Sequence, residues 1–329
     1  MSGMLRKLGF SLVPVIVIGA AAELGLRQSG WPKVTETFEH NSPFWVTDAS
    51  LENKAFPHKE EKKVFRVSSN ADGLRSVGAV RPKDESSLRV MALGCSTTFG
   101  WGVDDANSYP AQLQTLLDDA GVENVEVINA GQPGYTSFQG RWLWDESLQH
   151  YEPDVVLIGY VVQDARKAAY SDKSQAILQN DHRFMKDHFL YKSRAYLALR
   201  SMLGAVQIEA KERPQNGKGG IFRVPPEDYV DNLRVLVSNV QAIGATPVLF
   251  GFPLEREGYT ETHRKILLAA ARELDVPHLD LQGPMEDASR KAQLYFSNDR
   301  GHANAAGNKQ IATWVFDFLV EQSLLKRPE

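Results

Sequence analysis

A regular alternation of short apolar segments with helical patterns runs along the chain from residue 87 onward. Each apolar segment has the length of a strand and is followed by a stretch that can hold a helix. Strands joined through helices pair in parallel, and such a sheet is covered on both faces. The sequence therefore predicts an α/β fold. The predicted strands are Leu88–Leu93, Val125–Ile128, Val155–Tyr160, Pro247–Phe252 and His278–Leu281.

Three of the helical patterns carry an apolar stripe. The first ends near Gly121 and the second at Gly244, and glycine is common just past the end of a helix. The third lies close to the C-terminus. The stripes are Tyr109, Leu113, Leu116 and Leu117; Tyr229, Leu233, Leu236, Val237 and Val240; and Ile311, Trp314, Val315, Phe318 and Leu319.

Composition excludes several classes of function. The chain has 329 residues, a net charge of −4 and a single cysteine, Cys95, so it cannot form an internal disulfide. It has no basic stripe with interleaved aromatic residues, which argues against a nucleic-acid partner. It also lacks a phosphate-binding loop, a dinucleotide fingerprint and the His or Cys spacing of a metal site. We therefore expect no cofactor and no metal.

The N-terminus has the pattern of a membrane-targeting segment. Arg6 and Lys7 precede an uncharged stretch, 8–22, that is rich in Leu, Val, Ile and Ala. This predicts that residues 1–27 are either a retained membrane anchor with a single span or a cleaved signal peptide, since Ala20–Ala22 has the small residues that signal peptidase accepts. Basic residues on the N-terminal side predict that the rest of the chain lies outside the cytoplasm in both cases, periplasmic if anchored and secreted if cleaved.

The remaining chain divides into a linker region and one large domain. Residues 28–86 are rich in Pro, Asn, Ser and charge, and we expect a linker that becomes an accessory segment with short strands. Residues 87–325 form the α/β domain. Its alternation stops at an insertion, 165–226, for which we expect helical pieces around Tyr191–Leu203 and a flexible stretch at Lys211–Gly220.

Ser96 follows the first predicted strand of the α/β domain almost at once. The strand Leu88–Leu93 leads through Gly94 and Cys95 to this hydroxyl. In open parallel sheets the carboxyl ends of the strands border the crevice in which ligands bind. A serine at this place is a candidate nucleophile, although serine after a strand is also common as a turn residue or helix cap.

Asp299 and His302 lie three residues apart in a predicted turn before the C-terminal helix. This spacing can bring the carboxylate to one nitrogen of the imidazole ring, which fixes the tautomer and stabilises the imidazolium ion. Alone, the pair is also typical of a capped turn on the surface. With Ser96, it supplies the three groups of a serine nucleophile, a base and an acid.

Four sequence blocks resemble those of the SGNH, or GDSL-type, hydrolases in the same order. They are Gly94–Thr97, Asn129–Ser137, Pro153–Asp164 and Asp299–His302. The resemblance implies a three-layer α/β/α, flavodoxin-like fold with a five-stranded, mostly parallel sheet. The turn Asn70–Arg75, in which Asn or Gly would supply a positive φ, and the N-terminal segment are similar to those of bacterial, membrane-anchored members.

The resemblance also assigns roles to residues. It implies that Ser96 is the nucleophile, His302 the base and Asp299 the group that orients His302. Backbone N–H groups of Ser96 and Gly134 and the side-chain amide of Gln163 would form the oxyanion hole. Two positions depart from the family: Cys95 replaces an acidic residue next to the nucleophile, and Gln163 replaces an asparagine.

The glutamine places a condition on the oxyanion hole. Its amide is separated from the backbone by one more methylene than that of asparagine, so it can reach the oxyanion only if the backbone stands back or the side chain folds. We expect an extracytoplasmic serine esterase that cleaves an O-acyl group from an envelope glycan or a lipid. An O-acyltransferase with the same triad, and a non-catalytic envelope-binding protein on a degenerate fold, remain alternatives. The sequence leaves the oligomeric state open.

Overall fold

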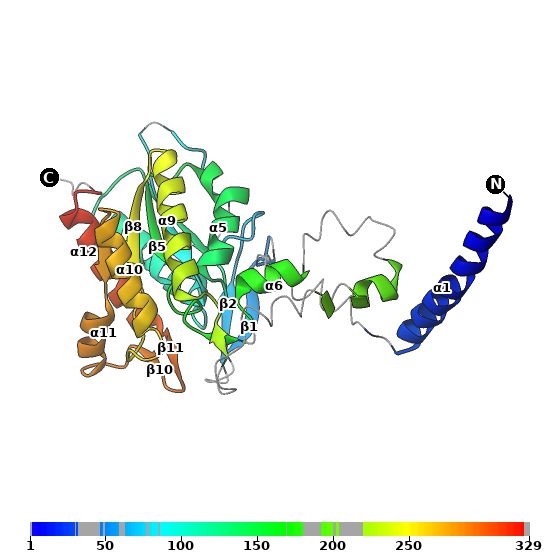
Figure 1. Ribbon diagram of the computed structural model, residues 1–329. Coiled ribbons are helices and arrows are strands. Elements are labelled where there is room, and N and C mark those ends of the chain that lie inside the picture. The colour runs from blue at the N-terminus through cyan, green and yellow to red at the C-terminus, as the bar shows by residue number, and fades with distance from the viewer. Residues whose placement is uncertain are drawn as a thin grey trace. The chain divides into compact units, whose positions relative to one another are not determined.

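The chain forms two compact units, one of residues 1–43 with 169–221 and one of residues 44–168 with 222–329. The larger unit contains the α/β sheet (Figure 1). The computed structural model describes residues 2–29, 31, 47–48, 50–58, 63–76, 79–84, 86–168, 170–179, 192–199, 202–203 and 220–325.

A five-stranded parallel sheet forms the centre of the larger unit and confirms the predicted α/β fold. Its spatial order is β4-β3-β5-β8-β9, so the first strand along the chain lies between the second and the third. The direction of winding reverses at β3, and ligands of open α/β sheets bind at such a reversal. The strands are β3 (Leu88–Gly94), β4 (Val125–Gly131), β5 (Val155–Gly159), β8 (Thr246–Gly251) and β9 (His278–Asp280).

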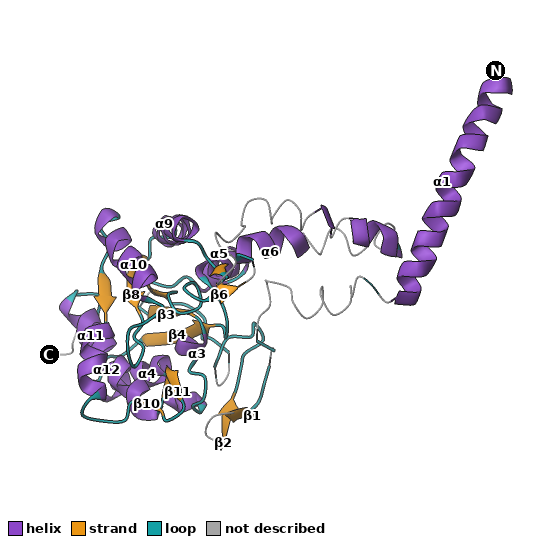
Figure 2. Cartoon of the chain, turned by 60° about the horizontal axis from the view of Figure 1, so that its bottom comes forward, coloured by secondary structure: helices purple, strands orange, loops and turns teal. Residues whose placement is uncertain are grey.

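Helices cover both faces of this sheet because successive side chains of a strand point to opposite sides. Met91 and Leu93 belong to one core cluster with helices α5, α9 and α10, whereas Val90 and Ala92 belong to a second with α4, α11 and α12. Figure 2 shows α9 and α10 on one side of the sheet and α4 and α12 on the other. The helices are α4 (Tyr109–Asp119), α5 (Ser137–Glu146), α9 (Pro226–Ala242), α10 (Glu261–Glu273), α11 (Gln282–Ser289) and α12 (Ala305–Glu321).

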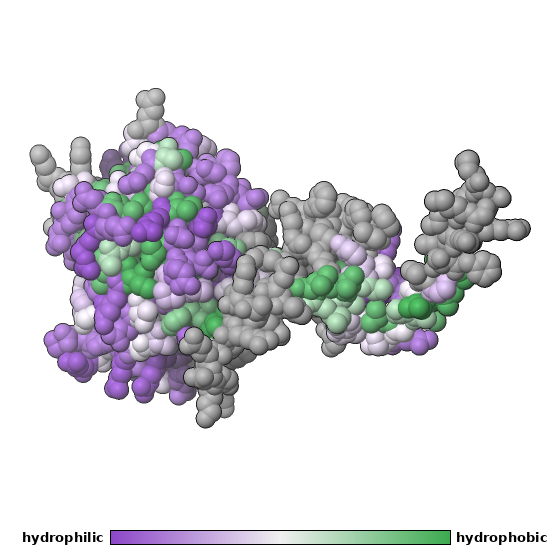
Figure 3. Space-filling view, viewed as in Figure 1, coloured by the Kyte–Doolittle hydropathy of each residue, from purple (hydrophilic) through white to green (hydrophobic). Residues whose placement is uncertain are grey.

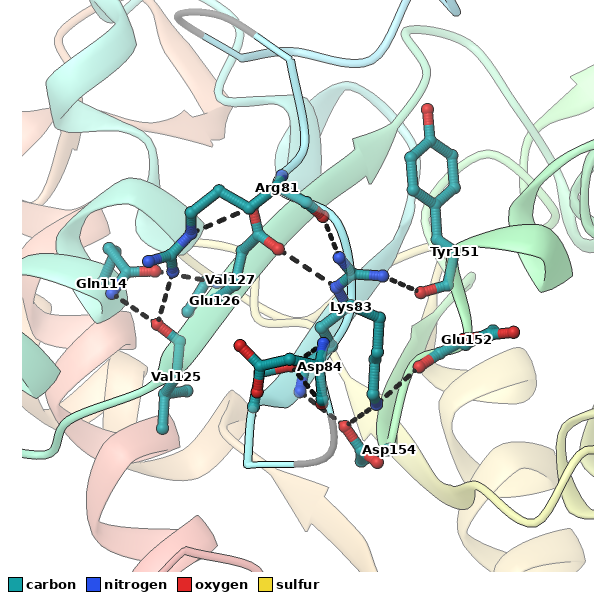
Figure 4. Close-up of polar contacts among 12 residues, drawn as sticks. Arg81, Lys83, Asp84, Gln114, Val125, Glu126, Val127, Tyr151, Glu152 and Asp154 are labelled. Atoms are coloured by element: carbon teal, nitrogen blue, oxygen red, sulfur yellow. Dashed lines mark hydrogen bonds and ion pairs between the residues drawn. The ribbon is translucent and has the colours of Figure 1, made fainter.

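A cluster of charged side chains lies at the amino-terminal ends of the strands of the sheet. Arg89, at the start of β3, is 4% exposed, and its Nε donates to Glu126 of β4 at 3.0 Å. Asp154, just before β5, accepts from the Arg89 backbone N–H at 2.6 Å and pairs with Lys83. Figure 4 shows Arg81 and Lys83 reaching Glu126 and Asp154. Ion pairs and the hydrogen bond from the Arg89 backbone to Asp154 therefore connect the amino-terminal ends of three neighbouring strands.

An accessory hairpin and a buried arginine contact the other edge. Strands β1 (Lys54–His58) and β2 (Lys63–Val67) pair antiparallel, and Phe65 packs in a cluster with Phe99. Arg75 is buried, and its guanidinium donates to the carbonyl oxygens of Phe99 and Gly100, each at 2.7 Å. In the predicted turn before it, glycine supplies the positive φ, with 74° at Gly73.

Short elements complete the larger unit. The helix α3 (Ser96–Phe99) follows β3, and the antiparallel strands β10 (Tyr295–Phe296) and β11 (Asp299–Ala303) precede α12. The remaining elements are the 3₁₀ turns Asp105–Asn107 and Leu148–Tyr151 and the short strands β6 (Lys167–Ala168) and β7 (Ile221–Phe222).

In the smaller unit, the helix α1 (Ser2–Ser29) contacts a segment of the predicted insertion. The carboxylate of Glu23 accepts from the backbone N–H groups of Ala195 at 2.8 Å and Arg194 at 3.0 Å and from the Ser193 hydroxyl at 2.9 Å. The bonds to Ala195 and Arg194 lower the pKa of Glu23 to about 2. Residues 194–199 are helical, so Glu23 caps their first turn.

The predicted insertion is described in part. Helical turns at 194–199 and 202–203 lie within the predicted Tyr191–Leu203 pieces, and α6 (Asp172–Gln179) precedes them. The stretch predicted as flexible lies outside the described residues except for Gly220. Apolar side chains of α1 are exposed at the surface, as Figure 3 shows. Among the described residues, no helix is long and apolar enough to cross a membrane.

Candidate active site

Ser96 lies in a tight strand-to-helix turn at the carboxyl end of β3. The strand ends at Gly94, Cys95 is the N-cap, and Ser96 is the first residue of α3. A Cβ atom on Gly94 would lie 2.1 Å from Thr98 Oγ1, so only glycine lets α3 fold back against the strand end. This places the Ser96 hydroxyl where the winding of the sheet reverses.

His302 and Asp299 form a continuous hydrogen-bond chain with Ser96. The Nε2 atom of His302 lies 2.8 Å from Ser96 Oγ, and its Nδ1 lies 2.6 Å from Asp299 Oδ2. An ionised carboxylate only accepts, so Nδ1–H donates to Asp299 and Nε2 is left as the acceptor that faces the serine hydroxyl. This is the tautomer that a general base requires.

The Asp299–His302 segment is a strand, where the sequence predicts a turn. Both residues belong to β11, which pairs with the two-residue β10 in an irregular register. The turn prediction is wrong because so short and polar a strand has no apolar alternation to reveal it. Asp299 Oδ1 still accepts from the backbone N–H groups of Gly301 at 3.0 Å and His302 at 3.2 Å, which resembles a turn locally.

Hydrogen bonds hold the Asp299 carboxylate in its ionised form. Burial by itself raises the pKa of Asp299, but the hydrogen bond and charge of His302 and the backbone N–H groups of Gly301 and His302 outweigh it, so the pKa lies below its ordinary value. An ionised Asp299 can stabilise the imidazolium that forms when His302 takes a proton.

Two asparagines that the sequence analysis does not single out support the His302 strand. Asn304 caps α12 by accepting from Gly307 N–H at 3.0 Å and donates to the Tyr295 carbonyl at 3.2 Å. Asn308 donates to the Ala303 carbonyl at 2.8 Å. Asn304, directly before the first residue of α12, carries the sequence signal of an N-cap. Asn308 carries no signal, because its partner depends on the tertiary fold.

Gly134 and Gln163 follow the two strands that flank β3. Gly134 has a φ of 83° after β4, and the backbone N–H of Tyr135 donates to the Gln132 carbonyl at 3.1 Å. Proline followed by a glycine of positive φ is the pattern of a type II turn. Gln163 follows β5 and is half-buried. Ser96, Gly134 and Gln163 therefore lie at one edge of the sheet, at the carboxyl ends of three adjacent strands.

Arg223 joins the last two of these residues. Its Nη1 donates to the Gly134 carbonyl at 2.7 Å and to Gln163 Oε1 at 3.2 Å, and its Nη2 donates to Gln139 Oε1 at 3.2 Å. No sequence motif marks Arg223, which lies far along the chain from its partners.

The sequence model of the GDSL-like lipase/acylhydrolase family matches residues 92–310, which is more than half of the chain and spans all four blocks. The chain belongs to this family. It is a hydrolase that acts on ester bonds. The non-catalytic alternative is therefore not supported.

Solved structures similar to this GDSL-like acylhydrolase share little sequence with it. The acetylxylan esterase Axe2 from Geobacillus stearothermophilus is 17% identical, with 71% of this chain and 94% of that chain covered and a TM-score of 0.48. A putative lipolytic protein of the G-D-S-L family from Desulfitobacterium hafniense DCB-2 is 19% identical, covering 71% and 100%, with a TM-score of 0.47. The acetyl xylan esterase AlAXEase is 16% identical, covering 70% and 98%, with a TM-score of 0.47. A search of curated proteins finds no match.

The cysteine beside the nucleophile of this acylhydrolase is enclosed. Cys95 is 1% exposed and packs with Val162 and Leu254. Burial raises the pKa of its thiol, so the sulfur stays protonated and is a poor nucleophile. Within the described part of the chain, no group of His, Cys, Asp and Glu side chains could hold a metal ion.

Proposed function

We propose that this acylhydrolase is an extracytoplasmic serine esterase that removes O-acyl groups from a glycan or a lipid, with Ser96 as nucleophile. The observation that carries the proposal is the hydrogen-bond chain from Ser96 Oγ through His302 to Asp299, at 2.8 Å and 2.6 Å. In this arrangement His302 lies between the Asp299 carboxylate and the Ser96 hydroxyl, in contact with both. The chain also ends in a hydroxyl at the edge of the sheet where ligands bind.

The reaction proceeds in two halves. As Ser96 Oγ attacks the ester carbonyl carbon, His302 Nε2 takes its proton, and it returns that proton to the leaving alcohol as the C–O bond breaks. Water then attacks the acyl-serine, His302 takes a proton from it, and the carboxylic acid leaves as Ser96 regains its hydrogen. Asp299 remains ionised and stabilises the imidazolium in both halves.

Negative charge develops on the carbonyl oxygen in both tetrahedral intermediates. The backbone N–H groups of Ser96 and Gly134 and the side-chain amide of Gln163 are the proposed donors to this oxyanion. Removing one such donor typically raises the activation free energy by about 2.7–4 kcal/mol. The nucleophile and the proposed donors to the oxyanion would then all lie just after the carboxyl ends of β3, β4 and β5.

A fluorophosphonate probe tests this chemistry, because it reacts only with an activated serine. We expect full-length wild-type protein to be labelled at Ser96, and both Ser96→Ala and His302→Ala to be unlabelled. Ser86→Ala removes an exposed hydroxyl and serves as the matched control, which should label like the wild type. An unlabelled Ser96 in the wild type would refute the proposal.

The proposed location outside the cytoplasm is supported by the N-terminal pattern. Arg6 and Lys7 precede an uncharged stretch, and Ile16 and Val17 of α1 are 65% and 60% exposed, leaving apolar surface for lipid. In bacterial cells, we expect the C-terminus of the full chain to be cut by protease added to spheroplasts. Replacing Ile16 and Val17 by lysine should abolish this, whereas Gln28→Lys should not. Protection of the wild-type C-terminus would contradict the proposed location.

A further inference from the structure

We propose that Arg223 adapts the oxyanion hole to a glutamine by holding Gln163 and Gly134 in position. The inference rests on the proposed function, because it assumes that these two residues face the oxyanion. Arg223 is a positioning residue in this scheme. Its guanidinium contacts the two donor residues, and these residues contact the substrate.

Arg223 fixes the orientation of the Gln163 amide. A guanidinium has only donors, so the atom of Gln163 that faces Arg223 at 3.2 Å must be the amide oxygen Oε1. The amide nitrogen, on the other arm of the same planar group, then points away from Arg223. No described residue accepts a hydrogen bond from this nitrogen. Both of its N–H groups are therefore available to a substrate oxygen.

The same guanidinium nitrogen also contacts Gly134. Nη1 of Arg223 donates to the Gly134 carbonyl at 2.7 Å as well as to Gln163. The bond fixes the peptide group that follows Gly134, a residue whose φ of 83° already restricts the turn. One nitrogen atom therefore contacts both residues that carry the proposed donors, and these residues belong to different loops.

Hydrogen bonds also hold Arg223 itself in place. Its Nη2 donates to Gln139 Oε1 at 3.2 Å, and Gln139 in turn accepts from the Thr136 backbone N–H at 3.0 Å in the first turn of α5. The backbone N–H of Arg223 donates to the Arg166 carbonyl at 2.8 Å. A guanidinium presents donors on separate nitrogen atoms in a rigid plane, so it can bind these three acceptors together, whereas all donors of an ammonium group lie on one nitrogen.

These contacts can hold the longer side chain of Gln163 so that its amide reaches the oxyanion. Its extra methylene adds one rotatable bond, so a free Gln163 amide would occupy several orientations and seldom face the oxyanion. Anchoring Oε1 removes that freedom before the substrate arrives. Catalytic groups need this kind of support, since small displacements from the productive geometry lower the rate sharply.

Two substitutions separate the anchor from the donor. Arg223→Met removes the anchor and leaves the Gln163 amide, whereas Gln163→Glu keeps an acceptor for Arg223 but has no N–H to offer. In full-length protein with p-nitrophenyl acetate, we expect kcat to fall about 10²–10³-fold in Gln163→Glu. In Arg223→Met we expect a fall of about 10- to 100-fold. KM should change by less than about twofold in both, because oxyanion donors act in the transition state.

The double variant shows whether Arg223 acts through Gln163. We expect its kcat to lie close to that of Gln163→Glu alone, because an anchor has little left to do once the donor is absent. Arg223→Lys keeps the charge but replaces the planar fork with one nitrogen atom, so its kcat should fall between those of wild type and Arg223→Met. It replaces Arg223→Met if that variant does not fold. Arg234→Met, on the exposed face of α9, is the matched control and should keep wild-type kcat and Tm.

Wild-type kcat in Arg223→Met, or losses that multiply in the double variant, would overturn the role of Arg223. A rise in KM with unchanged kcat would also overturn it, because the residue would then act on substrate binding. These outcomes leave the proposed function intact as long as the fluorophosphonate probe still labels Ser96. Absence of that label in the wild type would instead refute the proposed function.

Discussion

At the scale of single residues, the candidate site depends on groups whose hydrogen-bonding capacity is restricted to one role. Asp299 only accepts, so it determines which nitrogen of His302 carries the proton. Arg223 only donates, so it determines which end of the Gln163 amide faces away from it. The Ser96 hydroxyl can both donate and accept, and it lies at the end of the hydrogen-bond chain that Asp299 and His302 form.

Asp299→Asn tests the first restriction with little change in shape. The asparagine amide would donate to His302 Nδ1 and leave the proton on Nε2, so the ring could no longer accept the proton of Ser96. We expect kcat to fall about 10³–10⁴-fold on p-nitrophenyl acetate. Asp287→Asn, on the exposed side of α11, is the control. Activity within tenfold of wild type would show that the tautomer does not depend on Asp299.

The lowered pKa of Asp299 makes its contribution to stability depend on pH. The ordinary value is 3.8, and the folded value lies below it. A lowered carboxyl pKa stabilises the folded state above the unfolded pKa, and this contribution is lost as pH falls through the folded pKa. The difference in unfolding free energy between wild type and Asp299→Asn should therefore be constant near neutral pH and shrink below about pH 4. Urea titrations at several pH values measure it, and a difference that grows toward acid would contradict this sign.

At the scale of elements, the turns that leave β3 and β4 carry the constraints. Gly94 allows α3 to fold back on its own strand, and a Cβ on Gly131 would meet the backbone of Phe99 at 2.4 Å. Two neighbouring strands thus end in glycines because α3 lies directly against both. The nucleophile is held by close backbone packing around a helix of four residues.

Gly94→Ala should therefore disturb both stability and activity. The added methyl group would lie 2.1 Å from Thr98 Oγ1, so α3 must shift. We expect a loss of about 1–3 kcal/mol in unfolding free energy, with a lower kcat. Gly283→Ala is the matched control, because nothing lies within 4 Å of its added Cβ in α11. Equal behaviour of the two variants in urea unfolding would show that α3 can move freely.

The five strands of the sheet could be predicted from their apolar residues and from the helical patterns between them. Val155–Gly159 is wholly apolar, whereas β4 also contains Glu126 and Asn129. Ser96, Asp299 and His302 could be proposed because they lie at strand ends or in a short motif, and the structure brings them together. β11 could not, since its residues are polar and its partner β10 is only two residues long. Arg223 could not either, because a long side chain reaches partners that sequence distance does not indicate.

At the scale of the whole molecule, the two edges of the sheet have different chemistry. The carboxyl edge gathers the hydroxyl, imidazole and amide groups of the candidate site. The amino edge is joined by ion pairs, with Arg89 and Glu126 side chains only 5% and 15% exposed. Groups at the second edge are separated from the first by the length of the strands, so they can stabilise the sheet without entering the reaction.

Arg89→Met should lower stability and leave catalysis unchanged. It breaks an ion pair of low exposure and removes the bonds to the Tyr151 and Arg81 carbonyls. We expect a loss of about 3 kcal/mol, at the lower end for a broken buried pair, because Arg81 still neutralises Glu126. Urea unfolding and kcat below the transition measure the two effects. Arg290→Met is the exposed control, and a fall in kcat in Arg89→Met would link the two edges.

The buried guanidinium of Arg75 has a practical consequence for anyone who dissects this enzyme. Because it donates to the Phe99 and Gly100 carbonyls, the last turn of α3 depends on a residue that precedes the first strand of the sheet. A fragment cut at residue 87, where the α/β alternation begins, would retain every proposed catalytic group and lose the clamp on the helix that carries the nucleophile. The shortest useful expression clone therefore has to begin upstream of Arg75, the residue that makes this contact.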